Sequence, residues 1–108
     1  MSLDLPKPIA KFFSAQERGD YQLLTLCFAA DASVRDEGRT FKGRPAIVQW
    51  MADAKQKYGH TAEPLAITWR DGKLIVATRL TGAFPGSPIE VTHTFVLEGE
   101  NIAELEIG

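Results

Sequence analysis

Apolar side chains near the start of the chain recur every three or four residues, which is the spacing of one face of a helix. Ile9, Phe12 and Phe13 follow this spacing and predict a first helix over about residues 8–18. Gly19 comes directly after it and suits the left-handed position that ends many helices. The chain therefore opens with an amphipathic helix that has one buried face.

A second, shorter helix is expected over residues 21–28. Asp20 precedes it and can cap it, because its side-chain oxygen can accept hydrogen bonds from the free backbone N–H groups of the first turn. Residues 29–32 have the composition expected at the C-terminal end of a helix. The buried stripe of this helix would be Leu23, Leu24, Cys27 and Phe28.

A short hairpin and a third helix follow. Residues 34–36 would begin a strand, residues 37–39 carry a turn signal, and residues 40–42 suit a short returning strand. Pro45 is favourable in the first turn of a helix, and Gly59 ends the next helical pattern. The apolar face of this longest helix contains Ile47, Trp50, Met51, Ala54 and Tyr58.

Beyond residue 60 the apolar period changes from about 3.6 to 2, which indicates a change from helix to sheet. Asp71 and Gly72 form a tight hairpin turn, and the prolines in the segment 84–88 cannot continue a ladder of hydrogen bonds. Four strands are expected, and their inward positions are Leu65, Ile67 and Trp69, then Leu74, Val76, Thr78 and Leu80, then Val91, His93, Phe95 and Leu97, and finally Ala103, Leu105 and Ile107.

Three helices followed by strands with short connections predict an α+β domain, in which a strongly curved antiparallel sheet wraps around the helices as a cone. Such a cone leaves a cavity between the sheet and the longest helix. The opposite face of two of these strands is poor in charge, with Arg79 as the one charged residue among the uncharged ones named below, so we expect it to pair with a second copy in a homodimer. That outer face carries Ile75, Ala77, Thr81, Thr92, Thr94 and Val96.

The composition narrows the classes of partner. The chain has 108 residues, the size of one domain (1–108), and a formal net charge of −2, which lacks the basic face that nucleic-acid binding requires. No apolar run approaches the ~20 residues of a membrane span, so a cytoplasmic protein without membrane contacts is expected. Cys27 lies in an apolar run and is expected to be a buried hydrophobic residue.

Several short motifs, in this order along the chain, carry a resemblance to a known family. They are Arg18-Gly19-Asp20, the segment from Phe28 to Asp36, Phe41-Lys42-Gly43-Arg44, the segment from Phe84 to Pro88, and Asn101-Ile102-Ala103-Glu104-Leu105. The chain resembles the NTF2-like superfamily of cystatin-like α+β cones, and within it the SnoaL-like and ketosteroid-isomerase-like proteins. The resemblance covers nearly the whole chain. It does not fix the activity, because one fold hosts many functions.

The resemblance implies a role for Asp36, since ketosteroid isomerases carry their aspartate base at the end of a Val-x-Asp segment such as Val34-Arg35-Asp36. A carboxylate at the edge of an apolar cavity can act as a base when partial desolvation raises its pKa. The alternative is that Asp36 caps the turn at Glu37 and Gly38, or pairs with Arg39.

The other two catalytic positions of the isomerases differ here. Their donor tyrosine in the first helix aligns with Phe12, which cannot donate a hydrogen bond, and their protonated aspartic acid on the penultimate strand aligns with His93. Imidazole can donate, accept or titrate, so His93 could act as an acid, a base or a ligand anchor. The alternative is a structural histidine. His60 follows Gly59 in an expected surface loop and should be solvated.

Two functional hypotheses follow. The first is a cofactor-free pocket protein that binds a small, largely apolar molecule and transfers a proton with Asp36 and His93, as an isomerase or cyclase would. The second is a binding or interaction module without catalysis. No spacing typical of metal ligands is present. The expected ligand contacts are Phe12, Trp50, Met51, Trp69, Val76, Thr78, Val91, Phe95 and Leu105.

Overall fold

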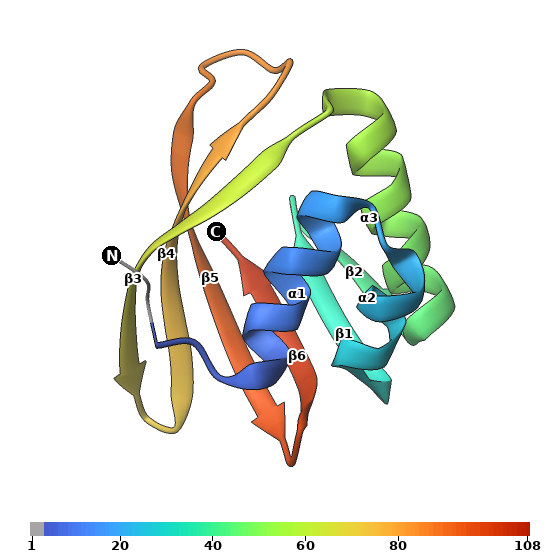
Figure 1. The fold of residues 1–108 in the computed structure, drawn as a ribbon, viewed down its shortest axis with the longest axis vertical. Helices are drawn as coiled ribbons and strands as arrows, with labels where there is room; N and C mark the ends of the chain where they lie inside the picture. Colours follow the sequence, from blue (N-terminus) through green and yellow to red (C-terminus); the bar gives the residue numbers. More distant parts are fainter. Residues whose placement is uncertain (1–3) are drawn as a thin grey trace.

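A computed structural model describes residues 4–108, so the first three residues of the expected domain lie outside it. The elements follow one another as helices α1 (Lys7–Arg18) and α2 (Tyr21–Cys27), strands β1 (Phe28–Asp36) and β2 (Arg39–Lys42), helix α3 (Arg44–Tyr58), and strands β3 (Thr61–Arg70), β4 (Lys73–Thr81), β5 (Ile89–Glu98) and β6 (Asn101–Ile107). The three predicted helices and the predicted strands are present, in the expected order (Figure 1).

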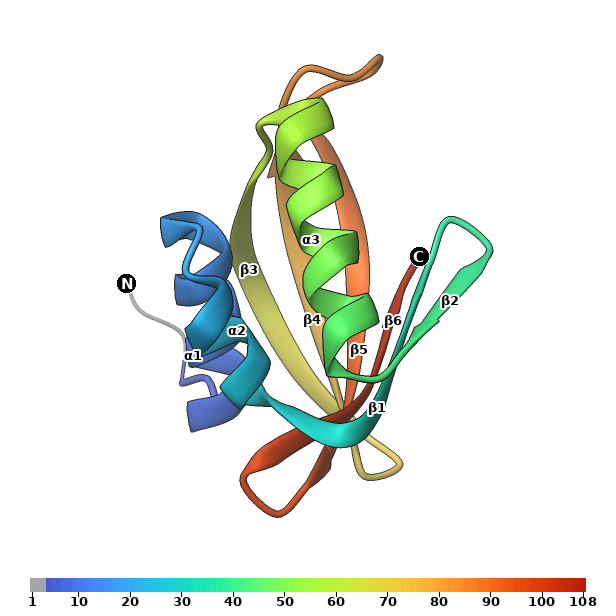
Figure 2. The same cartoon turned by 90° about the vertical axis from the view of Figure 1, so that its right-hand side faces the viewer.

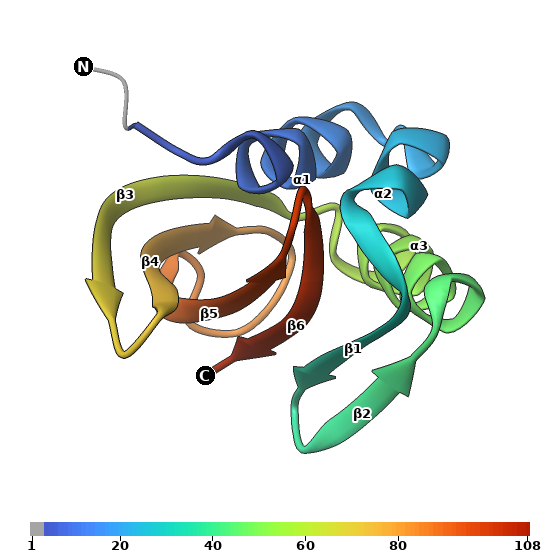
Figure 3. The ribbon, with the colours of Figure 1, turned by 90° about the horizontal axis from the view of Figure 1, so that it is seen from below.

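One curved sheet contains all six strands, in the order β2-β1-β6-β5-β4-β3. Neighbouring strands run antiparallel except β1 and β6, which are parallel. Seen from below, β3 to β6 curl strongly, while the β1–β2 hairpin extends away from them beside α3 (Figure 3). Helix α3 lies across the concave side of the sheet, and α1 and α2 lie beside it (Figure 2). The predicted α+β cone is confirmed.

The helix ends follow the local chemistry of the sequence. Gly19 adopts a left-handed φ of 65° at the end of α1, and the side chain of Asp20 accepts a hydrogen bond from the Leu23 N–H at the start of α2. Gly59 ends α3 with φ of 54°. These caps were predictable because they depend on residues that are adjacent in the sequence.

The segment before Asp36 differs from the sequence-based prediction. Residues 29–32 do not end a helix, because the chain is already extended at Phe28, the first residue of β1. Residues 34–36 are therefore the last part of β1, not its beginning. The physical reason is pairing between distant segments: Phe28 pairs with Ile102 in β6, and this contact overrides the helix propensity of the alanines.

Two expected inward positions on the strands are not fully buried. In β6, Ile102 is buried and Ala103 is only half-buried, because the β5–β6 register shifts between Val96 and Leu97. A one-residue shift exchanges the two faces of a strand. In β3, Trp69 pairs with the buried Leu74 and so lies on the expected face, but its side chain is 56% exposed. It lies on the edge strand, two residues from the hairpin turn, where little covers it.

The core lies between α1, α2 and the concave face of the sheet. Phe12, Phe28 and Phe95 are its largest fully buried side chains, and Cys27 is buried there as expected. No helix within residues 4–108 has both the length and the apolar composition needed to cross a membrane.

Candidate functional site

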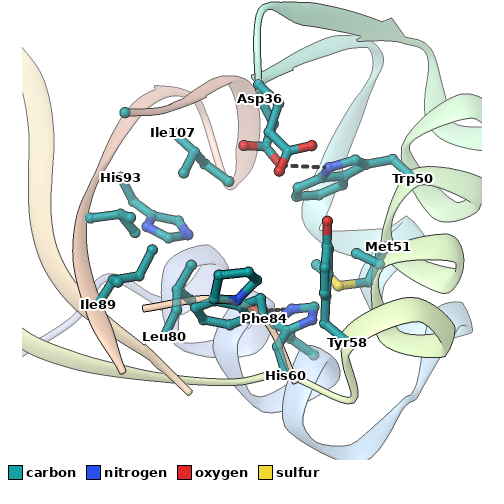
Figure 4. Close-up of a pocket in the computed structure, with 16 residues that line it drawn as sticks. Asp36, Trp50, Met51, Tyr58, His60, Leu80, Phe84, Ile89, His93 and Ile107 are labelled. Atoms are coloured by element: carbon teal, nitrogen blue, oxygen red, sulfur yellow. Dashed lines mark hydrogen bonds between the residues drawn. The ribbon is translucent and has the colours of Figure 1, made fainter. Parts of the chain in front are cut away.

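A cavity of about 510 Å³ lies between α3 and the concave side of the sheet, which is where the cone predicted one. This volume is in the range of small-molecule sites. Its walls come from α3, from β4 and β5 with the loop between them, and from the ends of β1 and β6 (Figure 4). No lysine or arginine is among the described residues that line it. The cavity is therefore suited to a ligand that is largely apolar and not anionic.

Asp36 enters the cavity from the end of β1. The two-residue turn at Glu37 and Gly38, both with positive φ, reverses the chain there and leaves Asp36 paired with Arg39 in the β1–β2 ladder. Its carboxylate does not form a salt bridge with Arg39, which lies over the Phe41 ring instead, 5.2 Å from its centroid. Arg39 therefore does not neutralise the Asp36 carboxylate, which lines the cavity.

Trp50 fixes the position of this carboxylate. The indole Nε1 donates a hydrogen bond of 3.0 Å to Oδ2 of Asp36, from the middle of α3 (Figure 4). Partial burial raises the pKa of Asp36 above its usual value, and this hydrogen bond opposes the rise by stabilising the charged form. The result is a carboxylate in a partly apolar wall, with one oxygen held by the protein.

His93 lines the same cavity as Asp36, on the wall that faces α3, and its imidazole points inward from β5 (Figure 4). The side chain is 1% exposed and packs against the rings of Phe12, Phe13 and Phe95, at centroid distances of 5.6 to 6.1 Å. Burial, with a smaller contribution from nearby His60, lowers the pKa of His93 to about 4. At neutral pH this imidazole is uncharged, so it offers one N–H donor and one acceptor nitrogen.

His60 contradicts the sequence-based expectation of a solvated loop. It is 8% exposed, it lines the cavity, and its Nε2 accepts a hydrogen bond of 2.7 Å from the side-chain amide Nε2 of Gln16 in α1. Burial and the Lys55 ammonium lower the pKa of His60. The loop after Gly59 is covered by the β4–β5 connection, because the Ala83 N–H bonds to the Tyr58 carbonyl.

Gln16 was missed by sequence reasoning, although a signal was present. It follows Phe12 and Phe13 at helical spacing and therefore falls on the buried face of α1. A polar residue on an apolar face needs a partner, and here the partner is forty-four residues away in the sequence. The sequence alone could flag Gln16 but could not name His60.

The predicted site residues divide into two groups. Asp36, His93, Trp50, Met51 and Val91 line the cavity. Phe12, Val76, Thr78, Phe95 and Leu105 are fully or almost fully buried in the protein and do not line it, and Trp69 is exposed away from it. Alternation along a strand identifies inward positions, but it does not distinguish those that touch the cavity from those beneath the helices.

Asp36 and His93 converge on one cavity without touching each other. No hydrogen bond joins them in the part of the chain that the structure describes, and the side-chain partner of Asp36 there is Trp50. The direct contact that a coupled acid–base pair would make is absent, so the two groups can act on opposite sides of one ligand. Within residues 4–108, no cluster of His, Cys, Asp and Glu side chains could hold a metal ion.

A family model and a solved structure show which known proteins this chain is similar to. The family model for the SnoaL-like domain matches residues 9–105. A candidate polyketide cyclase from Sinorhizobium meliloti, known from its crystal structure, is 39% identical and superposes with a TM-score of 0.96, over 100% of this chain and 99% of that chain. No curated protein matches the sequence.

More distant structures share the fold. A protein from Catenulispora acidiphila with a ketosteroid isomerase-like fold, solved in complex with trimethylamine, has a TM-score of 0.82 at 20% identity, covering 95% of this chain and 85% of that chain. The epoxide hydrolase/cyclase-like enzyme SalBIII, which acts in pyran ring formation in the polyether salinomycin, has a TM-score of 0.79 at 18% identity, covering 94% and 86%. At these identities the likeness concerns the fold.

Proposed function

The chain belongs to the SnoaL-like domain family, and we propose that it binds a small, largely apolar carbonyl compound and moves a proton on it without a cofactor. Asp36 is the base in this proposal, and His93 is the hydrogen-bond partner of the carbonyl oxygen. The relative from Sinorhizobium meliloti, described as a candidate polyketide cyclase, supports this class of substrate, because ring closure of a polyketide begins with such a proton transfer.

The observation that carries the proposal is the half-buried carboxylate of Asp36 in the wall of an otherwise largely apolar cavity. Burial raises the pKa of Asp36, so its carboxylate is a stronger base than one in bulk water. The Trp50 hydrogen bond holds one carboxylate oxygen in place. A backbone hydrogen bond from Glu37 also lowers the pKa of Asp36 and so offsets part of the rise that burial causes.

The chemistry is balanced with these two groups alone. Asp36 takes a proton from the carbon next to the carbonyl, and the electron pair of the broken C–H bond moves into an enolate. The oxygen of the enolate carries the negative charge and accepts a hydrogen bond from the neutral imidazole of His93. In an isomerisation, the substrate carries a neighbouring C=C bond, and the extended enolate takes the proton back from Asp36 at the far carbon, so that the double bond moves. In a cyclisation, the enolate carbon attacks an internal carbonyl, and the new alkoxide oxygen takes the proton from Asp36.

The test is exchange of carbon-bound hydrogen in heavy water. We expect the wild type to accelerate deuterium incorporation into 2-tetralone, an apolar ketone with acidic C–H bonds, as measured by proton NMR. Asp36→Asn should lower the protein-catalysed rate by at least about 100-fold, since a general base contributes that much or more. Asp31→Asn is the matched control, because Asp31 is an exposed carboxylate of the same strand outside the cavity. Equal rates in the two variants would refute the role of Asp36.

A second candidate function is ligand binding without catalysis, and Phe12 favours it. The isomerases use a tyrosine there, whereas Phe12 is buried, has no polar atom in its side chain and does not line the cavity. Stabilisation of an enolate would then depend on His93 without a second strong donor. This candidate predicts that 2-tetralone binds, as chemical shift changes would show, while deuterium incorporation stays at the rate without protein.

A further inference from the structure

Tyr58 brings a hydroxyl group to the wall of the cavity, from the last residue of α3. Within residues 4–108 this hydroxyl makes no hydrogen bond. Two N–H groups at the same cavity are already engaged, because the Trp50 indole donates to Asp36 and the Gln16 amide donates to another buried side chain. The Tyr58 hydroxyl is therefore a polar group of the cavity that the protein itself does not use.

The direction of the Tyr58 side chain follows from its place on α3. Trp50, Ala54 and Tyr58 all line the cavity and are spaced four positions apart. Residues at this spacing lie along one face of a helix, and their side chains tilt toward the N-terminus of the helix. The Tyr58 ring therefore extends past the small methyl group of Ala54. Figure 4 shows the Tyr58 hydroxyl pointing to the side of the cavity where Trp50 and Asp36 meet.

The ring of Tyr58 is held by its neighbours. Phe84 from the β4–β5 loop meets it in a T-shaped contact, with 5.8 Å between the ring centroids and an interplanar angle of 88°. The ammonium group of Lys57 lies 5.1 Å from the centroid of the ring. The backbone carbonyl of Tyr58 accepts a hydrogen bond of 2.9 Å from the Ala83 N–H, which joins the end of α3 to the loop. A donor that is fixed in advance needs little reorganisation when charge develops on a ligand.

The direction toward Asp36 matters because of the geometry of an enolate. The oxygen of the enolate is only two bonds away from the carbon that gives its proton to Asp36, so it forms close to the same carboxylate. A phenol hydroxyl directed toward Asp36 can donate a hydrogen bond there. An enolate oxygen has lone pairs for two donors, so a bond from Tyr58 on α3 does not displace one from His93 on the wall that faces α3.

We propose that Tyr58 is a further catalytic residue, whose hydroxyl donates a hydrogen bond to the enolate oxygen that forms when Asp36 removes the proton. The proposal rests on the proposed function, and it deepens that function by adding the second donor that Phe12 cannot supply. The proton of Tyr58 stays on the phenol oxygen throughout, and no bond to Tyr58 is made or broken.

The first test is deuterium exchange into 2-tetralone by Tyr58→Phe, which removes the hydroxyl and keeps the ring contact with Phe84. We expect the protein-catalysed rate to fall at least about tenfold, mainly in kcat, because loss of one donor to an oxyanion costs about 100-fold or more. Tyr21→Phe is the matched control, since Tyr21 is the other tyrosine of the chain and lies on α2, outside the cavity. This control should exchange at the wild-type rate. A wild-type rate in Tyr58→Phe would overturn the proposal.

A binding experiment gives a readout that does not depend on turnover. 2-Naphthol resembles the enol of 2-tetralone, and 2-methylnaphthalene has the same shape without the oxygen. We expect the wild type to bind 2-naphthol at least about tenfold more tightly, measured as dissociation constants by NMR titration, because one or two net hydrogen bonds give that factor. Tyr58→Phe should reduce this preference about fivefold, with unchanged affinity for 2-methylnaphthalene, and Tyr21→Phe should keep it. No binding of 2-naphthol, no preference in the wild type, or an undiminished preference in Tyr58→Phe would also overturn the proposal.

Failure of this proposal can be told from failure of the proposed function. Asp36→Asn should lose deuterium exchange and keep the preference for 2-naphthol, because the amide leaves the Tyr58 hydroxyl in place. Wild-type exchange that persists in Tyr58→Phe would remove Tyr58 from the mechanism and leave the role of Asp36 standing. A preference for 2-naphthol that depends on Tyr58, without any exchange in the wild type, would remove both catalytic roles and leave Tyr58 as a ligand-binding residue.

Discussion

The indole N–H of Trp50 donates a hydrogen bond of 3.0 Å to the Asp36 carboxylate, and this contact joins the middle of α3 to the end of β1. The two residues are fourteen positions apart, and the intervening β1–β2 hairpin brings them together. The bond acts on the pKa of Asp36 in the opposite direction to burial. Removing this hydrogen bond should therefore increase the effect of burial on the pKa of Asp36.

Trp50→Phe is expected to raise the pKa of Asp36 further, because the charged carboxylate loses a donor while the aromatic wall remains. The pH midpoint for deuterium exchange of 2-tetralone should move upward. The pKa itself can be followed by carbon-13 NMR of the carboxyl group, which does not depend on catalysis. Trp69→Phe is the matched control, since Trp69 is exposed and lies outside the cavity. An unchanged or lower pKa in Trp50→Phe would contradict the prediction.

Acid should destabilise the protein through His93. The pKa of His93 falls from 6.5 to about 4 on folding, so the unfolded chain takes up the proton first. Stability from this group is fully present above pH 6.5 and is lost as the pH falls to about 4, by up to about 3 kcal/mol. Urea unfolding at several pH values measures this loss. In His93→Leu, the free energy of unfolding should fall less between pH 6.5 and 4, because the contribution of His93 is gone. The loss of stability caused by protonation of His60 should remain.

Phe12→Tyr should not restore the missing donor of the isomerases. Phe12 is fully buried, with the rings of Phe13, Phe28 and Phe95 at centroid distances of 5.2, 5.9 and 5.6 Å. An added hydroxyl would lack both space and a partner, so the free energy of unfolding should fall by about 1–3 kcal/mol. Phe41→Tyr, at a half-buried position, should change it by less than about 0.5 kcal/mol. Equal stability of the two variants in urea would show that the core accommodates the hydroxyl.

We also propose that the outer face of the sheet pairs two copies of the chain. Ala77 lies on that face beside Thr92, and the two are paired across β4 and β5. Ala77→Glu would place like charges at a symmetric interface and should shift the sedimentation coefficient from that of a dimer to that of a monomer. Ala10→Glu is the control, since Ala10 is an exposed alanine of α1. A wild type that sediments as a monomer would refute the proposal.

The sequence by itself determined the parts of the fold that depend on neighbouring residues. Helix ends at Gly19 and Gly59, the cap at Asp20 and the turn at Asp71 and Gly72 were all predicted, because their conformations follow from local backbone preferences. The periodicity of apolar residues also placed His93 and Phe95 on the inward face of β5. Asp36 was found because a short motif of the family places it.

Tertiary structure decided what the sequence could not. Ile102 replaced Ala103 in the core, and residues 29–32 joined a strand, because register and pairing depend on segments far away in the chain. His60 became buried because Gln16 and the β4–β5 loop meet it in space. A polar side chain on an apolar face signals that a partner exists, but only the folded chain selects that partner, since hydrogen bonds form across distance in space and not along the sequence.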